Sequence, residues 1–424
     1  MLQKVEDLKN VSSKEVLGYA TGEHAKEIEE LAKSLRGKRV LHINATPQGG
    51  GVAEILKSLI PYLRAFGVEA EWYAFDPAQA PSGFFGFTNR LHNALQGEPT
   101  EFYQEEWATY ERVGQQVAAE LDEIPHDVLV VHDPQPLPAA RFLSYKLPRI
   151  LFIHIDTVNP QKGAWGQVLP FVEEYDQVVF SNEEFVNSHI SRERFRVFQP
   201  AIDPLAAKQR MVPQEEARSF LVPFGIPREG SLVVQVSRFD IWKNPSGVVE
   251  AFRIARQNCP GTKLALVGFQ EAKDNPEATK VYERVKAMAQ REKDIFLFFD
   301  PEVLAGSSIG EFTMMVQNAA DVVVQNSIRE GFGLTATEAM WKGKAVVGGP
   351  ASGIQKQIIR GENGLIAVSV EELAASLEYM LTDKEARARL GTAAKESVRK
   401  SFLMPRLLLD HLRLYKELVS PVEN

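Results

Sequence analysis

The sequence predicts an α/β protein of two similar domains, each built on a doubly wound parallel sheet with helices on both faces. The chain has 424 residues, which exceeds one ordinary core and suits two domains of roughly 200 residues each. Short apolar runs alternate with helix-like segments, and this alternation stops once and then restarts. Most runs are apolar throughout, as expected of strands that are covered on both faces in a parallel sheet.

The first series of apolar runs predicts five strands, at residues 38–44, 68–75, 127–133, 149–156 and 176–182. Between the first two, residues 52–67 predict a helix. Ile55, Leu59 and Leu63 recur there at helical spacing, and Gly67 ends the segment. These elements form the predicted N-terminal domain.

The second series predicts five more strands, at residues 231–239, 262–268, 294–299, 321–327 and 344–349. The segment between the two series, residues 198–230, contains five prolines and marks the domain boundary. We therefore expect an N-terminal domain over residues 1–205 and a C-terminal domain over residues 206–400. The remaining residues, 401–424, include an amphipathic stretch that predicts a last helix.

The composition argues against several classes of protein. The net charge is −8 and the Lys and Arg residues are scattered, so the basic face of a nucleic-acid-binding protein is missing. The single cysteine, Cys259, cannot form an intramolecular disulfide, and no Cys cluster could hold zinc. No apolar run approaches the ~18 residues that span a bilayer, and the N-terminal residues lack the apolar core of a signal peptide. We therefore expect a cytoplasmic protein without a membrane partner.

A glycine-rich segment, PQGGGVAEIL at residues 47–56, stands between the first strand and the first helix of the first series. Gly50 and Gly51 would let the backbone approach an anion, and the helix start would supply N–H donors. The spacing matches neither the dinucleotide fingerprint nor the P-loop, which disfavours a nicotinamide oxidoreductase. A phosphate-binding loop and a tight strand-to-helix turn both fit this segment.

Two cations follow the first strand of the second series. Arg238 and Lys243 lie in QVSRFDIWKN, on a loop that leads into a helix. Arg can hold a diphosphate as a fork and Lys as a point charge. Two solvated surface charges are the alternative. Their position at the carboxyl end of a strand, where α/β proteins bind ligands, favours the diphosphate.

Two acids flank two glycines in the segment EGFGLTATE. Glu330 and Gly331 follow a predicted strand, Gly333 precedes a helix, and Glu338 is expected near the first turn of that helix. Carboxylates accept hydrogen bonds from sugar hydroxyls, and backbone N–H groups at a helix start bind phosphates or hydroxyls. A retaining glycosidase needs its carboxyls ~5–5.5 Å apart, whereas eight helical residues span ~12 Å. Two separate binding roles therefore fit better, although the helix dipole alone would also explain Glu338.

Polar residues also mark the first series. HDPQP at residues 132–136 and HIDT at residues 154–157 each begin at the carboxyl end of a predicted strand, and HNALQG occupies residues 92–97. Polar side chains at strand ends would line a ligand site, although a lone histidine there is more often structural. None of these residues has metal-ligand spacing, so no metal site is predicted.

The two acids of EGFGLTATE, together with SRFDIWK and the glycine-rich loop, resemble the retaining glycosyltransferases of family 4, which have the GT-B fold. Within that family, HNALQG, VHDPQP, HIDT, QVSRFDIWK and SIREGFGLTATEAMWKGKAVVG are similar to segments of the trehalose glycosyltransferring synthases. The resemblance covers nearly the whole chain. It implies two Rossmann-like domains that face each other across a cleft, with the last helix crossing back to the first domain.

The resemblance also implies roles for individual residues. Arg238, Lys243, Glu330 and His154 would be catalytic. Arg238 and Lys243 would bind the donor diphosphate, Glu330 the transferred glucose and Glu338 the ribose, and His154 would line the donor sugar site. The other donor-binding residues implied are Gly50, Gly51, Gly331, Phe332, Gly333 and Leu334. Those assigned by position to the acceptor are Asp133, Asp156, Asn93 and Gln96.

The activity implied is transfer of glucose from a nucleoside diphosphate glucose to glucose, with retention and in a reaction that could run both ways. No cofactor is required, and Mg²⁺ would enter only through the nucleotide diphosphate. A homodimer is compatible with the resemblance. The alternatives are another acceptor, such as a sugar phosphate or a glucan, a nucleotide-sugar epimerase, and a nucleotide-binding sensor without turnover.

Overall fold

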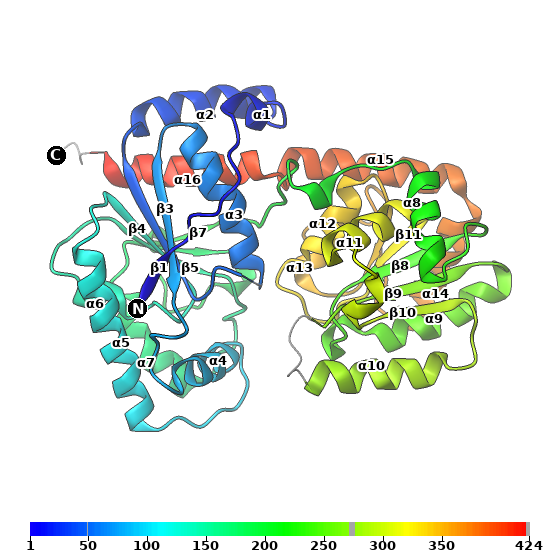
Figure 1. The fold of residues 1–424 in the computed structure, drawn as a ribbon, viewed down its shortest axis with the longest axis horizontal. Helices are drawn as coiled ribbons and strands as arrows, with labels where there is room; N and C mark the ends of the chain where they lie inside the picture. Colours follow the sequence, from blue (N-terminus) through cyan, green and yellow to red (C-terminus); the bar gives the residue numbers. More distant parts are fainter. Residues whose placement is uncertain (49, 271–275, 421–424) are drawn as a thin grey trace. The chain divides into compact units, whose positions relative to one another are not determined.

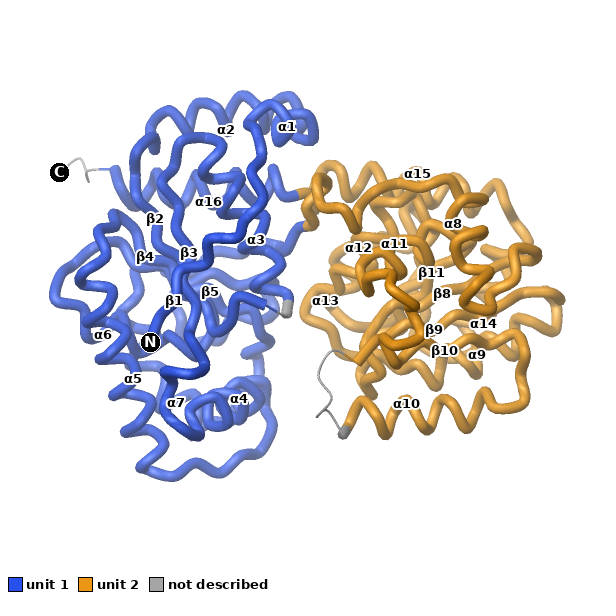
Figure 2. Tube along the Cα trace, viewed as in Figure 1, with its two compact units in different colours: residues 1–201, 404–424 blue, residues 202–403 orange. Residues whose placement is uncertain are grey.

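The computed structural model describes residues 1–48, 50–270 and 276–420. The chain divides into two compact units (Figure 2). Unit 1 comprises residues 1–201 and 404–424, and unit 2 comprises residues 202–403. The first division lies four residues before the boundary expected from the sequence, and the second lies at the start of the last helix, α16 (Met404–Val419). Helix α16 therefore belongs to unit 1 although it follows all of unit 2 in the chain.

Unit 1 is built on a seven-stranded sheet with the order β1-β3-β2-β4-β5-β6-β7. All neighbouring pairs are parallel except β1 with β3. All five predicted strands are confirmed, and the two edge strands, of three residues each, were not foreseen. The strands are β1 (Leu2–Lys4), β2 (Arg39–Asn44), β3 (Glu69–Phe75), β4 (Val128–His132), β5 (Arg149–Ile153), β6 (Gln177–Phe180) and β7 (Phe195–Val197).

Helices cover both faces of this sheet (Figure 1). On one face α16 packs against α2 and α3, and α1 also contacts α3. The other face carries α4 to α7, which pack on one another. Their bounds are α1 (Ser13–Leu17), α2 (Gly22–Leu35), α3 (Gly50–Ala65), α4 (Phe84–Leu95), α5 (Gln104–Asp122), α6 (Ala139–Phe142) and α7 (Lys162–Val172).

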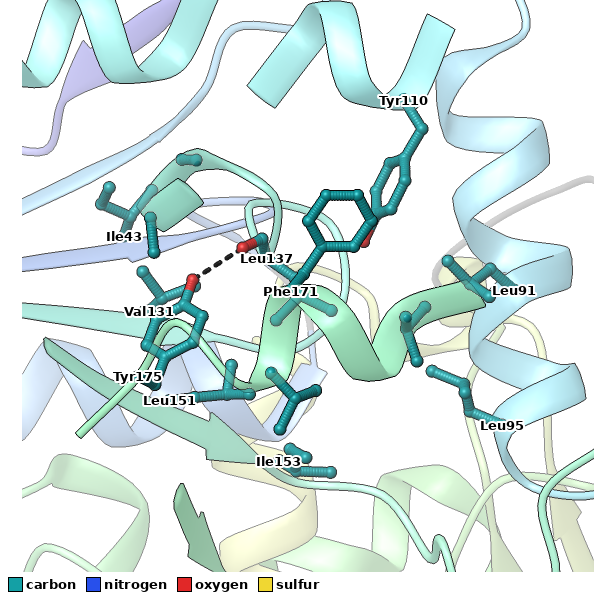
Figure 3. Packing of buried hydrophobic residues seen from close by; sticks show 14 of the residues in the cluster. Ile43, Leu91, Leu95, Tyr110, Val131, Leu137, Leu151, Ile153, Phe171 and Tyr175 are labelled. Carbon is teal, nitrogen blue, oxygen red and sulfur yellow. Dashed lines mark hydrogen bonds between the residues drawn. The ribbon is translucent and has the colours of Figure 1, made fainter. Parts of the chain in front are cut away.

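Alternate residues of the strands point into a core under α4, α5 and α7 (Figure 3). Ile43, Val131 and Leu151 supply the sheet side of this core and are essentially unexposed. Burying side chains of this size contributes about 1.5–3 kcal/mol each. The one phenol drawn with a hydrogen bond, Tyr175, donates to the carbonyl of Leu137 at 2.8 Å, so its hydroxyl is satisfied inside the core (Figure 3). The intervening strand residues point to the face covered by α3 and α16.

Unit 2 has a six-stranded parallel sheet with the order β10-β9-β8-β11-β12-β13. The five predicted strands are confirmed, and β13, of two residues, is additional. The strands are β8 (Leu232–Val236), β9 (Lys263–Val267), β10 (Ile295–Phe298), β11 (Val322–Gln325), β12 (Ala345–Gly348) and β13 (Leu365–Ile366). The longer helices are α8 (Gln214–Leu221), α9 (Pro245–Asn258), α10 (Pro276–Ala289), α11 (Ile309–Ala319), α12 (Leu334–Trp341), α14 (Val370–Thr382) and α15 (Lys384–Ser401), with a single turn at α13 (Ser352–Gln355).

Each sheet reverses its winding direction once. In unit 1 the chain proceeds outward from β2 on one side and from β4 on the other, and in unit 2 it does so from β8 and β11. Doubly wound sheets bind ligands beyond the carboxyl ends of the two strands at such a reversal. The loops after β2, β4, β8 and β11 are therefore the places to examine for a site. Within the described part of the chain, no helix is long and apolar enough to cross a membrane.

Candidate active site

The reversal in unit 2 holds an ion pair between two residues singled out from the sequence. Lys243 follows β8 and Glu330 follows β11, and the Lys243 Nζ donates to Glu330 Oε2. Each side chain is only 15% exposed. A lysine ammonium has three N–H donors and a carboxylate has two oxygens, so the pair retains donors and an acceptor for a ligand. The structure thus brings together a predicted diphosphate-binding cation and a predicted sugar-binding carboxylate.

Polar side chains from the two strands hold this ion pair in place. Gln235, at the end of β8, donates to the carbonyl of Lys243 at 3.1 Å and accepts from the Asn326 N–H at 3.1 Å. Ser327 donates to Glu330 Oε2 at 3.3 Å. The sequence analysis did not single out Gln235, Asn326 or Ser327. Their signal was a glutamine at 1% exposure within an otherwise apolar strand, which must find hydrogen-bond partners.

The glycine-rich loop after Glu330 is fixed by close backbone packing. Gly333, at the start of α12, has φ +89°, and a Cβ there would lie 2.5 Å from the Ile354 side chain. The buried Gln357 side chain donates to the carbonyl of Phe332 and, at 3.2 Å, to that of Gly353. Only glycine meets both demands at position 333, because it tolerates positive φ and adds no Cβ. The loop is therefore held in one conformation at the start of α12.

Gly353 provides a test of this packing, because a Cβ there would lie 2.6 Å from the Gly331 carbonyl group. We expect Gly353→Ala to displace the loop and to destabilise the protein by about 1–3 kcal/mol, the usual effect of overpacking. Gly310→Ala in α11 is the matched control, since the nearest atom is 3.9 Å from its added Cβ. Urea unfolding of the two variants should separate them, and equal stability would contradict the tight packing.

Glu338 lies elsewhere than expected. It is the fifth residue of α12 rather than part of the first turn, so the helix dipole does not explain it. Its side chain is 7% exposed and forms a salt bridge with Lys208, with 3.1 Å between Lys208 Nζ and Glu338 Oε1. Burial lowers the pKa of the neighbouring Lys342 to about 8. Because Glu330 precedes the helix, the helical spacing assumed between the two acids was also wrong.

Arg238 is placed differently from Lys243. Its side chain is 72% exposed and pairs with Asp240, at 3.2 Å between Nη2 and Oδ2. Asp240 also accepts from the Trp242 N–H at 2.9 Å and so shapes the turn that leads to Lys243. The structure does not join Arg238 to the Lys243–Glu330 pair. An exposed guanidinium on this loop can reach a bound anion without disturbing the packing.

In unit 1, Gly50 and Gly51 form the start of α3 directly after the loop that follows β2. A Cβ at Gly51 would meet nothing within 4 Å, so packing does not explain this glycine. Gly49, the first glycine of the motif, lies outside the described residues. The predicted phosphate-binding segment therefore begins a helix at the reversal point of the sheet, as the sequence suggested.

His154 and Asp133 lie together at the carboxyl ends of β4 and β5. Asp133 Oδ1 accepts from the His154 N–H at 2.9 Å. Asp133 has φ +63°, a left-handed conformation that is uncommon for residues other than glycine. Burial lowers the pKa of the His154 imidazole, and the Asp133 charge opposes that shift. The strained aspartate is thus held by its bond to the backbone at His154.

The other predicted acceptor residues come from two segments that the fold brings side by side. Asn93 and Gln96 lie at the end of α4, and the backbone there accepts a hydrogen bond from Gln161, where Gln161 N lies 2.8 Å from the Ala94 oxygen. Gln161 follows the loop that contains Asp156, whose Oδ1 accepts from the Val158 N–H at 3.0 Å. All four predicted acceptor residues therefore belong to the carboxyl edge of one sheet or to the helix packed beside it. Among the described residues, no group of three or more His, Cys, Asp and Glu side chains is arranged to hold a metal ion.

Two family models match the chain. "Trehalose synthase, N-terminal domain" matches residues 42–187, and "Glycosyl transferases group 1" matches residues 219–397. A trehalose synthase from Pyrococcus horikoshii is 36% identical over 99% of this chain and 96% of its own length. Another from Rubrobacter xylanophilus is 39% identical over 93% of this chain and 94% of its own length.

The fold is shared with solved structures of more distant proteins. A sucrose-phosphate synthase from Thermosynechococcus elongatus has a TM-score of 0.68 at 18% identity, covering 90% of this chain and 99% of that structure. Two Rossmann-like parallel-sheet units in one chain are the architecture of the GT-B glycosyltransferases, and the predicted fold class is confirmed. The extent and identity of the sequence matches show that this chain belongs to the trehalose synthase family of group 1 glycosyltransferases.

Proposed function

We propose that this glycosyltransferase moves glucose from a nucleoside diphosphate glucose to free glucose and forms trehalose with retention of anomeric configuration. The Lys243–Glu330 pair carries the proposal. A nucleotide sugar presents a diphosphate directly beside a sugar ring, and this pair presents a cation directly beside a carboxylate. The printed names of the relatives, which are trehalose synthases, support trehalose as the product.

The proposed reaction exchanges one bond at the anomeric carbon for another on the same face. The bond from that carbon to the diphosphate oxygen breaks, and a bond to the acceptor hydroxyl oxygen forms. The acceptor proton passes to the departing phosphate oxygen. Negative charge grows on the diphosphate in the transition state, so Lys243 and Arg238 stabilise that state more than the bound substrate. Glu330 orients the sugar by accepting from its hydroxyls.

The predicted acceptor residues favour a neutral sugar. Asp133 and Asp156 are carboxylates and Asn93 and Gln96 are amides, which suit hydroxyl groups. A sugar phosphate would call for cations in the same set, and it contains none. Any Mg²⁺ would arrive with the nucleotide diphosphate rather than on a resident protein site.

Product analysis tests the proposal. The protein is incubated with ADP-, UDP- or GDP-glucose and either glucose or glucose 6-phosphate, and the sugars are separated by chromatography. Trehalose from free glucose is expected. Trehalose phosphate alone would assign a phosphorylated acceptor, and an altered donor sugar without acceptor would indicate an epimerase. Tight donor binding with no product over long incubation would indicate a sensor.

Arg238→Ala separates transition-state stabilisation from folding. Loss of one such charge contact lowers kcat by ~100-fold, equivalent to ~3 kcal/mol. The thermal midpoint should hardly change, because the side chain is exposed. Arg228→Ala is the control, since Arg228 is an exposed arginine of the same unit that pairs with Glu215. An unchanged kcat in the Arg238 variant would rule out its role at the leaving group.

A further inference from the structure

Four histidines and one tyrosine form a continuous hydrogen-bonded series in unit 1, which we call the histidine–tyrosine network. His154 Nε2 lies 3.0 Å from His132 Nδ1, and His132 Nε2 lies 3.1 Å from His42 Nδ1. The His42 Nε2 lies 3.1 Å from the Tyr415 hydroxyl, which lies 2.9 Å from His411 Nδ1. The network thus runs from the carboxyl end of β5 through β4 and β2 to α16.

The members of the network behind His154 are sealed from solvent. His42, His132, His411 and Tyr415 are each at most 2% exposed. Burial lowers the pKa of His42 to about 3 and lowers those of His132 and His411 well below the usual histidine value. All these imidazoles are therefore neutral near neutral pH, and each carries one N–H and one lone pair.

Ring stacking holds the imidazoles in their orientations. His132 and His154 stack with 5.3 Å between ring centroids and 19° between ring planes. The Phe152 ring stacks on His411 at 5.0 Å and 13°. A ring flip that exchanged Nδ1 for Nε2 would break these stacks, so a change of state must occur by moving protons rather than rings.

Proton counting leaves two arrangements. Each of the four contacts holds one proton, and every neutral imidazole donates through one nitrogen only. If Tyr415 donates to His42, it must accept from His411 Nδ1–H, and His42 and His132 must donate through Nδ1. The His154 proton is then also on Nδ1. If Tyr415 donates to His411 instead, all four histidines carry the proton on Nε2.

We propose that the histidine–tyrosine network fixes the tautomer of His154, with all four histidines sharing a single tautomer, and that His132, His42, Tyr415 and His411 are positioning residues for the reaction. Helix α16 thereby decides whether His154 Nδ1 is a donor or an acceptor. A sugar hydroxyl bound to that nitrogen would meet a fixed partner, which is how preorganised groups favour one geometry. The part of this proposal that concerns catalysis rests on the proposed function.

Nitrogen-15 NMR on histidine-labelled protein tests the shared tautomer directly, because long-range coupling patterns distinguish Nδ1–H from Nε2–H. Histidine substitutions assign the signals. In the free protein, His42, His132, His154 and His411 should all show the same tautomer. Two different tautomers among His42, His132 and His154 would overturn the proposal, since their contacts would then pair two donors or two lone pairs.

Tyr415→Phe removes only the hydroxyl that links His42 to His411. We expect the His411 tautomer to separate from those of the other three, and kcat for transfer to fall about fivefold, the rate equivalent of one hydrogen bond, with little change in KM. Tyr175→Phe is the matched control, because that buried hydroxyl bonds only to a backbone carbonyl within the core. An identical loss of kcat in both variants would reduce the network to a structural role.

His154→Ala keeps this test separate from the proposed function. If the four tautomers agree but His154→Ala transfers glucose at the normal rate, the network stands and the catalytic role of His154 fails. If trehalose is made but the tautomers disagree, the proposed function stands and the network fails.

Discussion

Substituting Lys243 with Met should lower the stability of the protein and the rate of glucose transfer together. The Lys243–Glu330 pair is largely buried, and removal of one partner leaves an uncompensated carboxylate. Breaking a buried pair in this way costs about 3–5 kcal/mol of unfolding free energy. The loss of a cation that stabilises the leaving diphosphate should lower kcat by at least ~100-fold. Urea unfolding and steady-state kinetics measure the two effects separately.

The double variant Lys243→Met with Glu330→Leu distinguishes these two contributions. Replacing a whole buried pair by apolar residues is often neutral or stabilising, so stability should return while activity stays absent. Lys286→Met is the control for the substitution itself, because Lys286 is exposed and pairs with Glu283 on the same helix. If the double variant remained as unstable as the single one, the pair would not explain the loss of stability.

Acid should unfold this protein through its buried histidines. The folded-state pKa of His42 is lowered to about 3 by burial, while an unfolded histidine titrates at its ordinary pKa near 6.5. Above pH ~6.5 both states are neutral and stability is unaffected. As the pH falls from ~6.5 toward ~3, the unfolded state binds protons that the folded state excludes, so the free energy of unfolding decreases.

The expected acid effect is large because four histidines of the network contribute to it. Each lowers the unfolding free energy by roughly 1 kcal/mol per pH unit within its range. The charged groups with an electrostatic effect on them are Asp133, which favours protonation of His154, and Arg406, which opposes protonation of His411. Together the four could remove most of a typical stability of about 5–15 kcal/mol between pH 6.5 and 4.5.

Chemical denaturation at a series of pH values checks this. His411→Gln removes one titrating group and should make the pH dependence of the unfolding free energy shallower by one histidine's share. The comparison of wild type and variant at pH 8 gives the packing cost, since no histidine of the network is charged there in either state. Equal slopes in the acidic range would show that His411 is protonated in the folded state.

The strand pattern was readable because continuous apolar runs have few other stable arrangements. Runs such as DVLVVHD and DVVVQNS became β4 and β11 with boundaries shifted by one or two residues. The edge strands β1, β7 and β13 were not readable, because two or three residues carry no periodicity and their pairing depends on neighbours already in place.

The candidate site was readable only in part. The sequence identified Lys243 and Glu330 from their places after strands, but not that they touch. That contact required β8 and β11 to be neighbours, although β9 and β10 separate them along the chain. The position of Glu338 was misjudged because the extended loop at the glycines delays the start of α12 to Leu334.

The sequence by itself determined the two α/β domains and the family, because apolar runs and the spacing of charged and glycine residues are local properties. The tertiary structure alone decided which of these residues meet. His42 and His132 become neighbours through strand order, and His411 joins them from a helix that lies after the whole of unit 2 in the chain. Such contacts depend on chain closure over hundreds of residues, and local periodicity holds no record of it.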